Sequence, residues 1–354
     1  MRFALVVTNL AGGGAERSML RLAAALARRG REVRLVLLED RIEHEVPPGI
    51  ALQVMRKNLA RGLVGKWLAG RQLKGLRLGA DWVTISTLPY ADEIAAAAGL
   101  PNLWCRIANT LSEEIEQLRR SRPAKAARRL ARYRRLYEGR NLVAVSEGVA
   151  QDLREVLGLR RAHIVRIYNG FDLSAIREAA AAVEPDLPED RFVLHAGRFM
   201  PQKRHDVLLE AWRQAALPHK LVLLTAASDA LERLIREKGL EQRVLVAGFR
   251  KNPYPWMRAA ELLVLSSDRE GMPNVLVEAL ACGTRVVSTD CPSGPREVMR
   301  GDLARYLVPP GDAQALARTI RAALAAPRPD AGLIPEEFSE AHMARAYEAL
   351  AQPA

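Results

Sequence analysis

The sequence has 354 residues, of which 49% are hydrophobic, 27% charged and 5% aromatic. This length suits two globular domains better than one, and the apolar content is enough for sizeable cores. No apolar run approaches the roughly 20 residues that span a bilayer, and the apolar start of the chain is too short for a signal peptide. We therefore expect a globular cytoplasmic protein.

The formal net charge is +12, and much of the positive charge is concentrated in two stretches. Residues 119–140 are rich in arginine and carry apolar residues at helical spacing, which predicts one basic amphipathic helix. The weaker basic stretch 56–77 also contains Val64, Trp67 and Leu68. An anionic membrane surface, nucleic acid and a solvated face all remain open as explanations.

The cysteines and histidines do not indicate a metal site or a disulfide framework. Cys105, Cys282 and Cys291 lack CxxC spacing, which favours reduced thiols. The histidines form no cluster with the spacing of metal ligands, and none follows an evident Ser or Cys nucleophile. The histidines are His44, His163, His195, His205, His219 and His342.

The first half of the chain alternates strand-like and helical segments. Its first predicted strand is followed by Gly12, Gly13 and Gly14 and then by a helix. Glycines before a helix N-terminus let backbone amides approach an anionic ligand, although a purely structural turn explains them equally well. The predicted strands are residues 3–7, 33–38, 82–85, 142–145 and 164–167.

The second half repeats this alternation after a turn at 169–172 and a proline-bearing polar connector at 184–190. Alternation of this kind predicts parallel sheets covered by helices on both faces, with ligands outside the carboxyl ends of the strands. A terminal helix is expected within 335–350. The predicted strands are 192–196, 220–225, 244–247, 262–265 and 285–288, and the predicted helices are 207–215, 230–238, 274–282 and 313–325.

Two cations follow the strand that opens the second half. Arg198 comes directly after the strand end, and Lys203 comes just before the next helix. Cations placed there can neutralise a diphosphate and stabilise the charge that develops when it leaves. The alternative is a pair of ordinary surface residues, but the strand's carboxyl end favours a binding role.

Two glutamates stand eight positions apart around a predicted helix start. Glu270 lies in the loop before the helix, and Glu278 lies within it. The free amides of a helix N-terminus attract an anion, so each carboxylate can hold hydroxyl groups on one side of that anion. A nucleotide-sugar, which is a diphosphate flanked by two sugars, suits this pattern better than the acid/base pair of a glycoside hydrolase.

These motifs together resemble the retaining GT-B glycosyltransferases of family 4, over nearly the whole chain. The resemblance rests on Gly12 to Glu16, the 169–172 turn, Gly197 and Arg198 with Lys203, and Glu270 through Gly283. The segment 290–297 is similar to bacterial members that assemble capsule, lipopolysaccharide or lipid-linked glycans.

The resemblance implies an α/β GT-B fold, with two Rossmann-like doubly wound parallel-sheet domains facing across a deep cleft. The first domain would comprise residues 1–172 and face the acceptor and the membrane. A linker at 173–190 would lead to the donor domain at 191–330. The last segment, 331–354, would form a helix that crosses the junction and packs back toward the first domain.

The resemblance also implies roles for single residues. Glu270 would contact the donor sugar, Arg198 and Lys203 would hold the diphosphate, and Glu278 would bind the ribose. No metal ion or cofactor is expected. The residues implied to bind the donor are Gly13, Gly14, Arg250, Gly271, Met272, Asn274, Val275 and Glu278.

One departure concerns the first domain, where many relatives carry a histidine near the reacting sugar. No histidine occurs from Trp104 to Ser112. Arg106 or Asn109 could contact the donor or the acceptor instead, and Asn109 could equally cap the helix that begins near Ser112.

The expected activity is the retaining transfer of a sugar, from a donor that is more plausibly UDP-linked than GDP-linked, to a glycan or lipid-linked acceptor. The two basic stretches would hold the enzyme on the inner face of the cytoplasmic membrane, and nucleic acid is not an expected partner. A sugar-nucleotide epimerase on the same architecture, which needs no acceptor, remains an alternative. A non-catalytic basic binding protein is the other.

Overall fold

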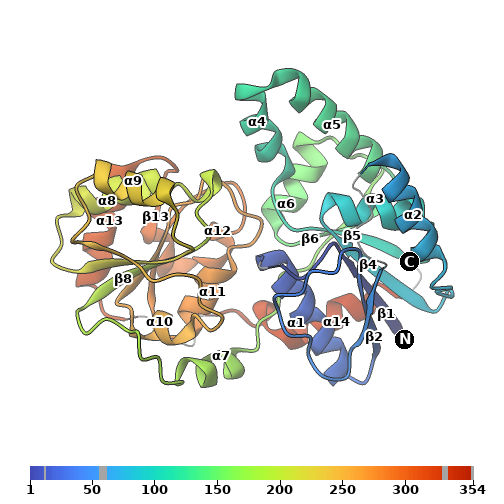
Figure 1. Cartoon of the computed structure of the whole chain (residues 1–354), viewed down its shortest axis with the longest axis horizontal. Helices are drawn as coiled ribbons and strands as arrows, with labels where there is room; N and C mark the ends of the chain where they lie inside the picture. The colour runs from blue at the N-terminus through green and yellow to red at the C-terminus, as the bar shows by residue number, and fades with distance from the viewer. Residues whose placement is uncertain (12, 56–61, 329–333, 352–354) are drawn as a thin grey trace. The chain divides into compact units, whose positions relative to one another are not determined.

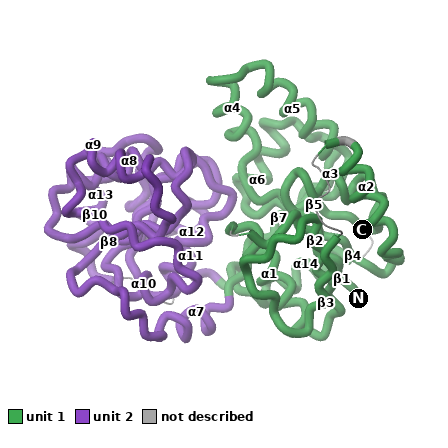
Figure 2. Tube along the Cα trace, viewed as in Figure 1, with its two compact units in different colours: residues 1–171, 336–354 green, residues 172–335 purple. Residues whose placement is uncertain are grey.

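The computed structural model describes residues 1–11, 13–55, 62–328 and 334–351 of the chain (Figure 1). The chain forms two compact units, which Figure 2 distinguishes by colour. Unit 1 comprises residues 1–171 and 336–354, and unit 2 comprises residues 172–335. Each unit is built on one parallel sheet, so the predicted pair of α/β domains with parallel sheets is confirmed.

The sheet of unit 1 has the strand order β3-β2-β1-β4-β5-β6-β7 among the described residues, and every neighbouring pair is parallel. Two of its strands were not predicted. All of β3 lies at the edge without a buried apolar run, and β5 contains Arg106, which interrupts its apolar pattern. The strands are β1 (Arg2–Val7), β2 (Glu32–Leu37), β3 (Ala51–Val54), β4 (Trp82–Thr87), β5 (Leu103–Ile107), β6 (Asn141–Ala144) and β7 (His163–Arg166).

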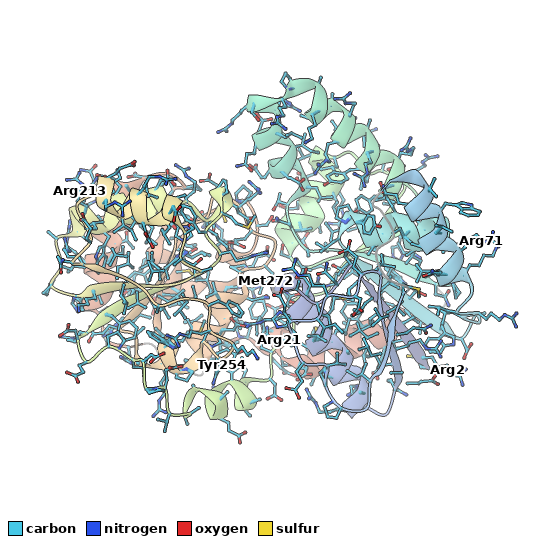
Figure 3. The ribbon with its side chains drawn as sticks, in the orientation of Figure 1. Arg2, Arg21, Arg71, Arg213, Tyr254 and Met272 are labelled. Carbon is cyan, nitrogen blue, oxygen red and sulfur yellow. The ribbon has the colours of Figure 1, made fainter. Side chains whose placement is uncertain are left out.

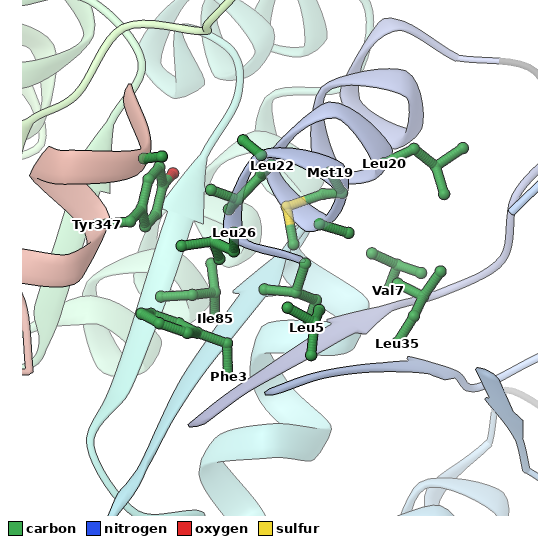
Figure 4. Close-up of a cluster of buried hydrophobic side chains, with 14 of the residues drawn as sticks. Phe3, Leu5, Val7, Met19, Leu20, Leu22, Leu26, Leu35, Ile85 and Tyr347 are labelled. Carbon is green, nitrogen blue, oxygen red and sulfur yellow. The ribbon is translucent and has the colours of Figure 1, made fainter. Parts of the chain in front are cut away.

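The helices of unit 1 cover this sheet, and the last helix of the chain joins them. Helix α14 (Glu340–Ala349) packs against α1, and its Tyr347 belongs to the same core as Phe3 and Leu22 (Figure 4). The backbone of Phe171 pairs with this returning segment. The other helices are α1 (Gly14–Arg28), α2 (Leu63–Lys74), α3 (Pro89–Ala97), α4 (Leu111–Ser121), α5 (Pro123–Tyr137) and α6 (Glu147–Gln151), followed by a π turn at Asp152–Val156.

The basic segment 119–140, which the sequence analysis expected to be one helix, is divided between α4 and α5. The break falls at Arg122, whose φ of −146° and ψ of 70° are not helical. The next residue is Pro123, which disfavours the helical conformation for the residue before it and is well suited to begin a helix. The prediction of a single helix was therefore wrong, for a local reason that the sequence contains.

The sheet of unit 2 has the order β10-β9-β8-β11-β12-β13 in the described part of the chain, again with parallel neighbours. Only the two-residue strand β13 was not predicted, because it is too short to show a pattern. The strands are β8 (Phe192–Ala196), β9 (Lys220–Leu224), β10 (Val244–Val246), β11 (Leu262–Leu265), β12 (Arg285–Thr289) and β13 (Leu307–Val308).

The segment expected to be a linker contains a packed helix of unit 2. Helix α7 (Leu173–Ala180) is capped by the side chain of Asp172 and packs against α10 and α11. None of the helices within the described ranges is long and apolar enough to cross a bilayer. The remaining helices are α8 (His205–Ala215), α9 (Asp229–Glu237), α10 (Tyr254–Ala259), α11 (Asn274–Ala281), α12 (Pro295–Val298) and α13 (Ala313–Ala325), with 3-10 turns η2 (Pro201–Lys203), η3 (Gly301–Tyr306) and η5 (Glu336–Phe338).

A buried carboxyl group joins three elements of unit 1. Asp92, on α3, is fully buried and accepts hydrogen bonds from Ser86 Oγ on β4 (2.5 Å) and from the Tyr137 hydroxyl on α5 (2.8 Å). Burial disfavours the charged form, and it raises the pKa of Asp92 from 3.8 to about 7 despite both hydrogen bonds.

This raised pKa predicts a specific dependence of stability on pH. Between about pH 4 and pH 7 the folded chain binds the Asp92 proton and the unfolded chain does not, so the stability from this group falls as the pH rises. We expect Asp92→Asn, which stays neutral, to gain stability relative to the wild type between pH 5 and pH 8, by up to roughly 3–4 kcal/mol.

Thermal denaturation followed by circular dichroism at several pH values measures this difference. The exposed Asp229 is the matched control, and Asp229→Asn should leave the pH dependence unchanged. Parallel curves for the wild type and Asp92→Asn would contradict the prediction.

Candidate functional site

The order of strands in unit 2 reverses between β8 and β11, which lie side by side although other strands separate them in the sequence. In open parallel sheets, the loops that follow such strands bind ligands outside the carboxyl ends. The loop after β8 carries Arg198 and Lys203, and the loop after β11 carries Glu270. The topology therefore places these three predicted residues at one edge of the sheet.

Hydrogen bonds join these two loops directly. Ser266 Oγ donates to the Lys203 carbonyl oxygen (2.7 Å), and the Asp268 amide donates to the Gln202 carbonyl oxygen (2.9 Å). The side chain of Gln202 donates in return to the Arg269 carbonyl oxygen (2.7 Å). The relative position of the loops is thus fixed before any ligand binds.

An ion pair connects the two residues that the sequence analysis assigned to opposite loops. Lys203 Nζ donates to Glu270 Oε1 at 2.6 Å, and the two side chains are 20% and 9% exposed. The Lys203 stem lies against Gly197, where an added Cβ would stand 3.4 Å from Lys203 Cε. An ammonium group has three N–H donors, so Lys203 can keep Glu270 and still donate to a ligand oxygen.

The residue after Lys203 has an unusual backbone conformation that the sequence analysis did not find. Arg204 has a φ of 49° and a ψ of 52°, in the left-handed region, and it forms ion pairs with Asp206 (2.9 Å) and Asp268 (2.8 Å). Such a conformation costs about 1–3 kcal/mol in a residue other than glycine. The two ion pairs hold it, and they fix the turn from η2 into α8 beside Lys203.

Arg198 is exposed at the same edge of the sheet. Its guanidinium makes no hydrogen bond or ion pair with another residue in the described ranges. A planar guanidinium with five N–H donors is well suited to oxyanions such as phosphate. Arg198 is therefore a cation available to a ligand.

The start of α11 supplies backbone donors. The amides of Gly271, Met272 and Val275 make no hydrogen bond within the described part of the chain, whereas the Asn274 amide donates to the Met272 carbonyl oxygen (2.9 Å). Of the amides assigned to the donor, that of Asn274 is thus already engaged. Met272, just before α11, is labelled in Figure 3. Glu278 lies on α11 and is 6% exposed.

Arg250 follows β10, and its side chain is held by its own unit. Its Nη1 lies 2.6 Å from Asp186 Oδ2, its Nε donates to the Ala247 carbonyl oxygen (3.1 Å), and its guanidinium lies 4.9 Å from the centre of the Trp256 ring. The Arg250 side chain thus anchors the connector that precedes β8. Its backbone remains the part that a ligand could use.

The glycine loop belongs to unit 1, apart from the other candidates in unit 2. Gly13 caps α1 and Gly14 is its first residue, while Gly12 lies outside the described residues. A Cβ on Gly13 would lie 2.0 Å from Glu16 Oε2. The Glu16 carboxylate therefore lies over the helix N-terminus that was expected to attract an anion.

Arg106 and Asn109, the two first-domain alternatives, are engaged within unit 1. Arg106 is 3% exposed, donates to Asn169 Oδ1 (2.5 Å) and Thr87 Oγ1 (3.3 Å), and interacts electrostatically with Tyr347 of α14. Burial lowers the pKa of its guanidinium. Asn109 accepts from the Thr110 amide (3.0 Å) just before α4. Arg106 thus lies between α14 and the sheet, and Asn109 supports the start of α4.

Two buried histidines, His195 and His205, lie beneath the site. His195 is fully buried, with Nδ1 2.9 Å from the Val264 carbonyl oxygen, and its ring meets that of His205 edge to face at 4.7 Å. Burial lowers the pKa of both imidazoles, that of His205 to about 4. Both rings are therefore neutral near pH 7 and add no charge to the site.

One cavity lies elsewhere in unit 2. A hollow of about 580 Å³ on η3 and α13 is lined by Arg305, Tyr306 and Arg318 and includes none of the candidate residues. All three cysteines are free thiols. In the ranges that the structure describes, no three His, Cys, Asp or Glu side chains gather as metal ligands.

Two protein families match the chain. The model described as Glycosyltransferase Family 4 matches residues 12–175, and the model described as Glycosyl transferases group 1 matches residues 190–326. Together they span both units.

Curated relatives and a solved structure agree with these families. An N-acetylgalactosamine-N,N'-diacetylbacillosaminyl-diphospho-undecaprenol 4-alpha-N-acetylgalactosaminyltransferase of Campylobacter jejuni is 28% identical over 87% of this chain and 86% of its own length. The lipopolysaccharide 1,6-galactosyltransferase of Escherichia coli is 30% identical over 48% of each chain. The structure of Anabaena Alr3699/HepE with UDP and glucose has a TM-score of 0.71 at 20% identity, covers 98% of each chain, and shows a shared fold.

The Lys203–Glu270 pair predicts a stability effect that is independent of any reaction. Lys203→Met leaves the Glu270 carboxylate without this cation, and removing one partner of a buried pair costs about 3–5 kcal/mol. We expect about 2–3 kcal/mol here, because Lys203 is partly exposed. Urea denaturation should show this loss, and adding Glu270→Gln should restore part of it.

The matched control is the surface pair between Arg213 and Glu210, in which Arg213 is 54% exposed (Figure 3). Arg213→Met should cost less than about 1 kcal/mol. Equal losses in the free energy of unfolding for Lys203→Met and Arg213→Met would show that burial of the Lys203–Glu270 pair does not contribute to stability.

Proposed function

Because this chain belongs to glycosyltransferase family 4, we propose that it moves a sugar from a nucleotide-sugar to a glycan or lipid-linked acceptor, with retention of the anomeric configuration. The observation that carries the proposal is the Lys203–Glu270 pair at the reversal of strand order in unit 2, together with Arg198, which has no partner among the described residues. This arrangement suits a diphosphate whose sugar faces a carboxylate.

In this proposal the residues act where charge develops. Breaking the bond between the sugar and the diphosphate leaves negative charge on the departing oxygen and positive character on the sugar. In unit 2, Arg198, Lys203 and the amides of Gly271 and Met272 stabilise the negative charge on the departing oxygen. They accelerate the step because they bind the charged transition state better than the ground state. Glu270 faces the sugar, and Glu278 holds the ribose.

The nature of the donor and acceptor is proposed from the relatives. The fold relative Alr3699/HepE was solved with UDP and glucose, which supports a UDP-sugar donor. The names of the Campylobacter and Escherichia relatives describe a diphospho-undecaprenol acceptor and lipopolysaccharide. We therefore propose a hexose or N-acetylhexosamine as the transferred sugar and bacterial surface-glycan synthesis as the setting.

The active-site assignment predicts the effect of single substitutions on transfer. Arg198→Ala, Lys203→Ala and Glu270→Ala should each lower kcat at least 100-fold, because loss of one group that stabilises transition-state charge costs about 2.7–4 kcal/mol. Arg233→Ala removes another exposed arginine of unit 2 and should retain wild-type turnover. Release of nucleotide from UDP-sugars, with and without a lipid-linked acceptor, measures the reaction.

Three outcomes would count against this assignment. Near wild-type turnover in any of the three variants would remove that residue from the site. Product formed without an acceptor would favour the epimerase alternative, and an inverted anomeric proton in the NMR spectrum of the product would overturn retention. We also propose that no metal is needed, so EDTA should leave the rate unchanged.

We further propose that unit 1 docks on an anionic membrane surface. Trp67 and Val64 on α2 are 58% and 72% exposed, and Arg71 lies 4.9 Å from the centre of the Trp67 ring, at the surface in Figure 3. Exposed aromatic and aliphatic groups beside cations are typical of interfacial helices. The rest of the first basic stretch, residues 56–61, lies outside the described residues.

The cations of α5 divide into two groups. Arg129 is paired with Glu114, and Arg132 is paired with Glu93, which also binds Lys66 of α2. These ion pairs hold α5 to its neighbours. Arg129 and Arg132 are therefore less available to lipid than the sequence suggested. Exposed cations without a hydrogen bond or ion pair in the described ranges are Arg120, Arg122, Lys125, Arg128 and Arg135.

Flotation with liposomes tests this docking. Replacing Lys125, Arg128 and Arg135 by Ala should weaken binding to vesicles with 30% anionic lipid by about tenfold or more, since each cation near such a surface contributes about 1 kcal/mol. The control replaces three exposed arginines of unit 2, Arg233, Arg236 and Arg318, and should bind as the wild type does. Equal losses in both triple variants would reduce the effect to net charge.

A further inference from the structure

A third loop lies against the candidate site, and the proposed function assigns it no role. Strand β12 pairs in parallel with β11, with Leu265 opposite Ser288, so the two strands end at the same edge. Thr289 Oγ1 donates to the Ser267 carbonyl oxygen at 2.6 Å and joins the two strand ends. The segment 290–294 continues from this point.

The segment 290–294 lies near the Lys203–Glu270 ion pair, as the environment of Cys291 indicates. Cys291 is 4% exposed, and burial together with the Glu270 carboxylate raises the pKa of its thiol, while Lys203 lowers it. Ser293 is 2% exposed. Cys291, Ser293 and Gly294 are therefore packed inside the protein, whereas Pro292 between them is exposed.

Gly294 makes the closest contact. Its φ is +90°, which side-chain-bearing residues rarely adopt, and an added Cβ would lie 2.4 Å from Pro273 Cδ. The same Cβ would lie 3.0 Å from the Gly271 carbonyl oxygen and 3.1 Å from Met272 Cα. Two of these three contacts are with backbone atoms, so a side chain at this position cannot be accommodated by a rotamer change alone.

The segment is held firmly from its other side. The Gly294 carbonyl oxygen accepts hydrogen bonds from the amides of Glu297 (3.0 Å) and Val298 (3.1 Å) at the start of α12. The Asp290 amide donates to the Val308 carbonyl oxygen of β13 (2.7 Å), and Arg296 forms an ion pair with Asp290. A side chain at position 294 would clash with the loop 271–273, and this clash would therefore displace that loop more readily than the segment 290–294.

We infer that Gly294 is a positioning residue for the anion-binding loop 271–273. It sets the place of the Gly271 and Met272 amides, and through the peptide bond to Gly271 it sets the place of Glu270. The inference rests on the proposed function, because it concerns the same diphosphate. It adds a residue that lies outside the two loops to which the sequence analysis assigned the diphosphate.

The test is the affinity for UDP, GDP and ADP, measured by isothermal titration calorimetry on the full chain. Gly294→Ala should bind the diphosphate that the wild type prefers at least tenfold more weakly. Gly239→Ala is the matched control, because Gly239 also has a positive φ (+64°) and nothing lies within 4 Å of an added Cβ. Both variants carry the backbone strain, but only Gly294→Ala presses on the loop, so Gly239→Ala should bind as the wild type does.

A second variant separates positioning from general damage. Pro273→Ala removes Cδ, which is the atom nearest to the added Cβ, so Gly294→Ala should lose less affinity in the Pro273→Ala background than in the wild type. This comparison applies even if Gly294→Ala alone folds poorly. The remaining contacts with Gly271 and Met272 make the expected rescue partial.

The outcomes are distinct. Wild-type affinity in Gly294→Ala, or an equal loss of affinity in Gly239→Ala, would overturn the positioning role while leaving the proposed function in place. The same fold loss with and without Pro273→Ala would overturn the mechanism through the loop. A wild type that binds none of the three diphosphates would overturn the proposed function and this inference with it.

Discussion

The parallel pairing of β8 with β11 is the constraint on which the site depends. These strands are neighbours in the sheet although β9 and β10 separate them in the sequence, so the loops that follow them meet at one edge. Lys203 and Glu270 are 67 residues apart in the chain and 2.6 Å apart in space for this reason. A slip of this pairing by one residue would turn the side chains of one strand to the other face and separate the loops.

Some of the features that position the site residues reduce the stability of the fold when each is taken alone. A partly buried ion pair and a left-handed Arg204 are both unfavourable taken alone. They persist because the core beneath them is well packed and largely apolar, and because the loops are joined by hydrogen bonds. The benefit of such an arrangement is that the charges need not reorganise when a bond to a diphosphate breaks.

Unit 1 depends in a different way on distant residues, because the chain leaves it after Phe171 and returns at Glu336. Glu348 of α14 accepts from Arg29 at 2.8 Å, and Tyr347 completes the core formed by α1 and β1. The buried Arg106 joins this returning helix to the carboxyl end of β5. Unit 1 is therefore completed by residues that follow unit 2 in the chain.

The alternation of strands and helices and the polar residues that follow β8 and β11 were predictable from local spacing and composition, and the resemblance of the motifs indicated the family. The division of 119–140 at Pro123 also has a local cause, because proline disfavours the helical conformation for the residue before it. The tertiary structure alone decided that Lys203 binds Glu270, that Asp186 holds Arg250, and that Gly294 touches the loop at 271–273. Each of these joins segments that are far apart in the sequence, and only the order and register of the sheet bring such segments together.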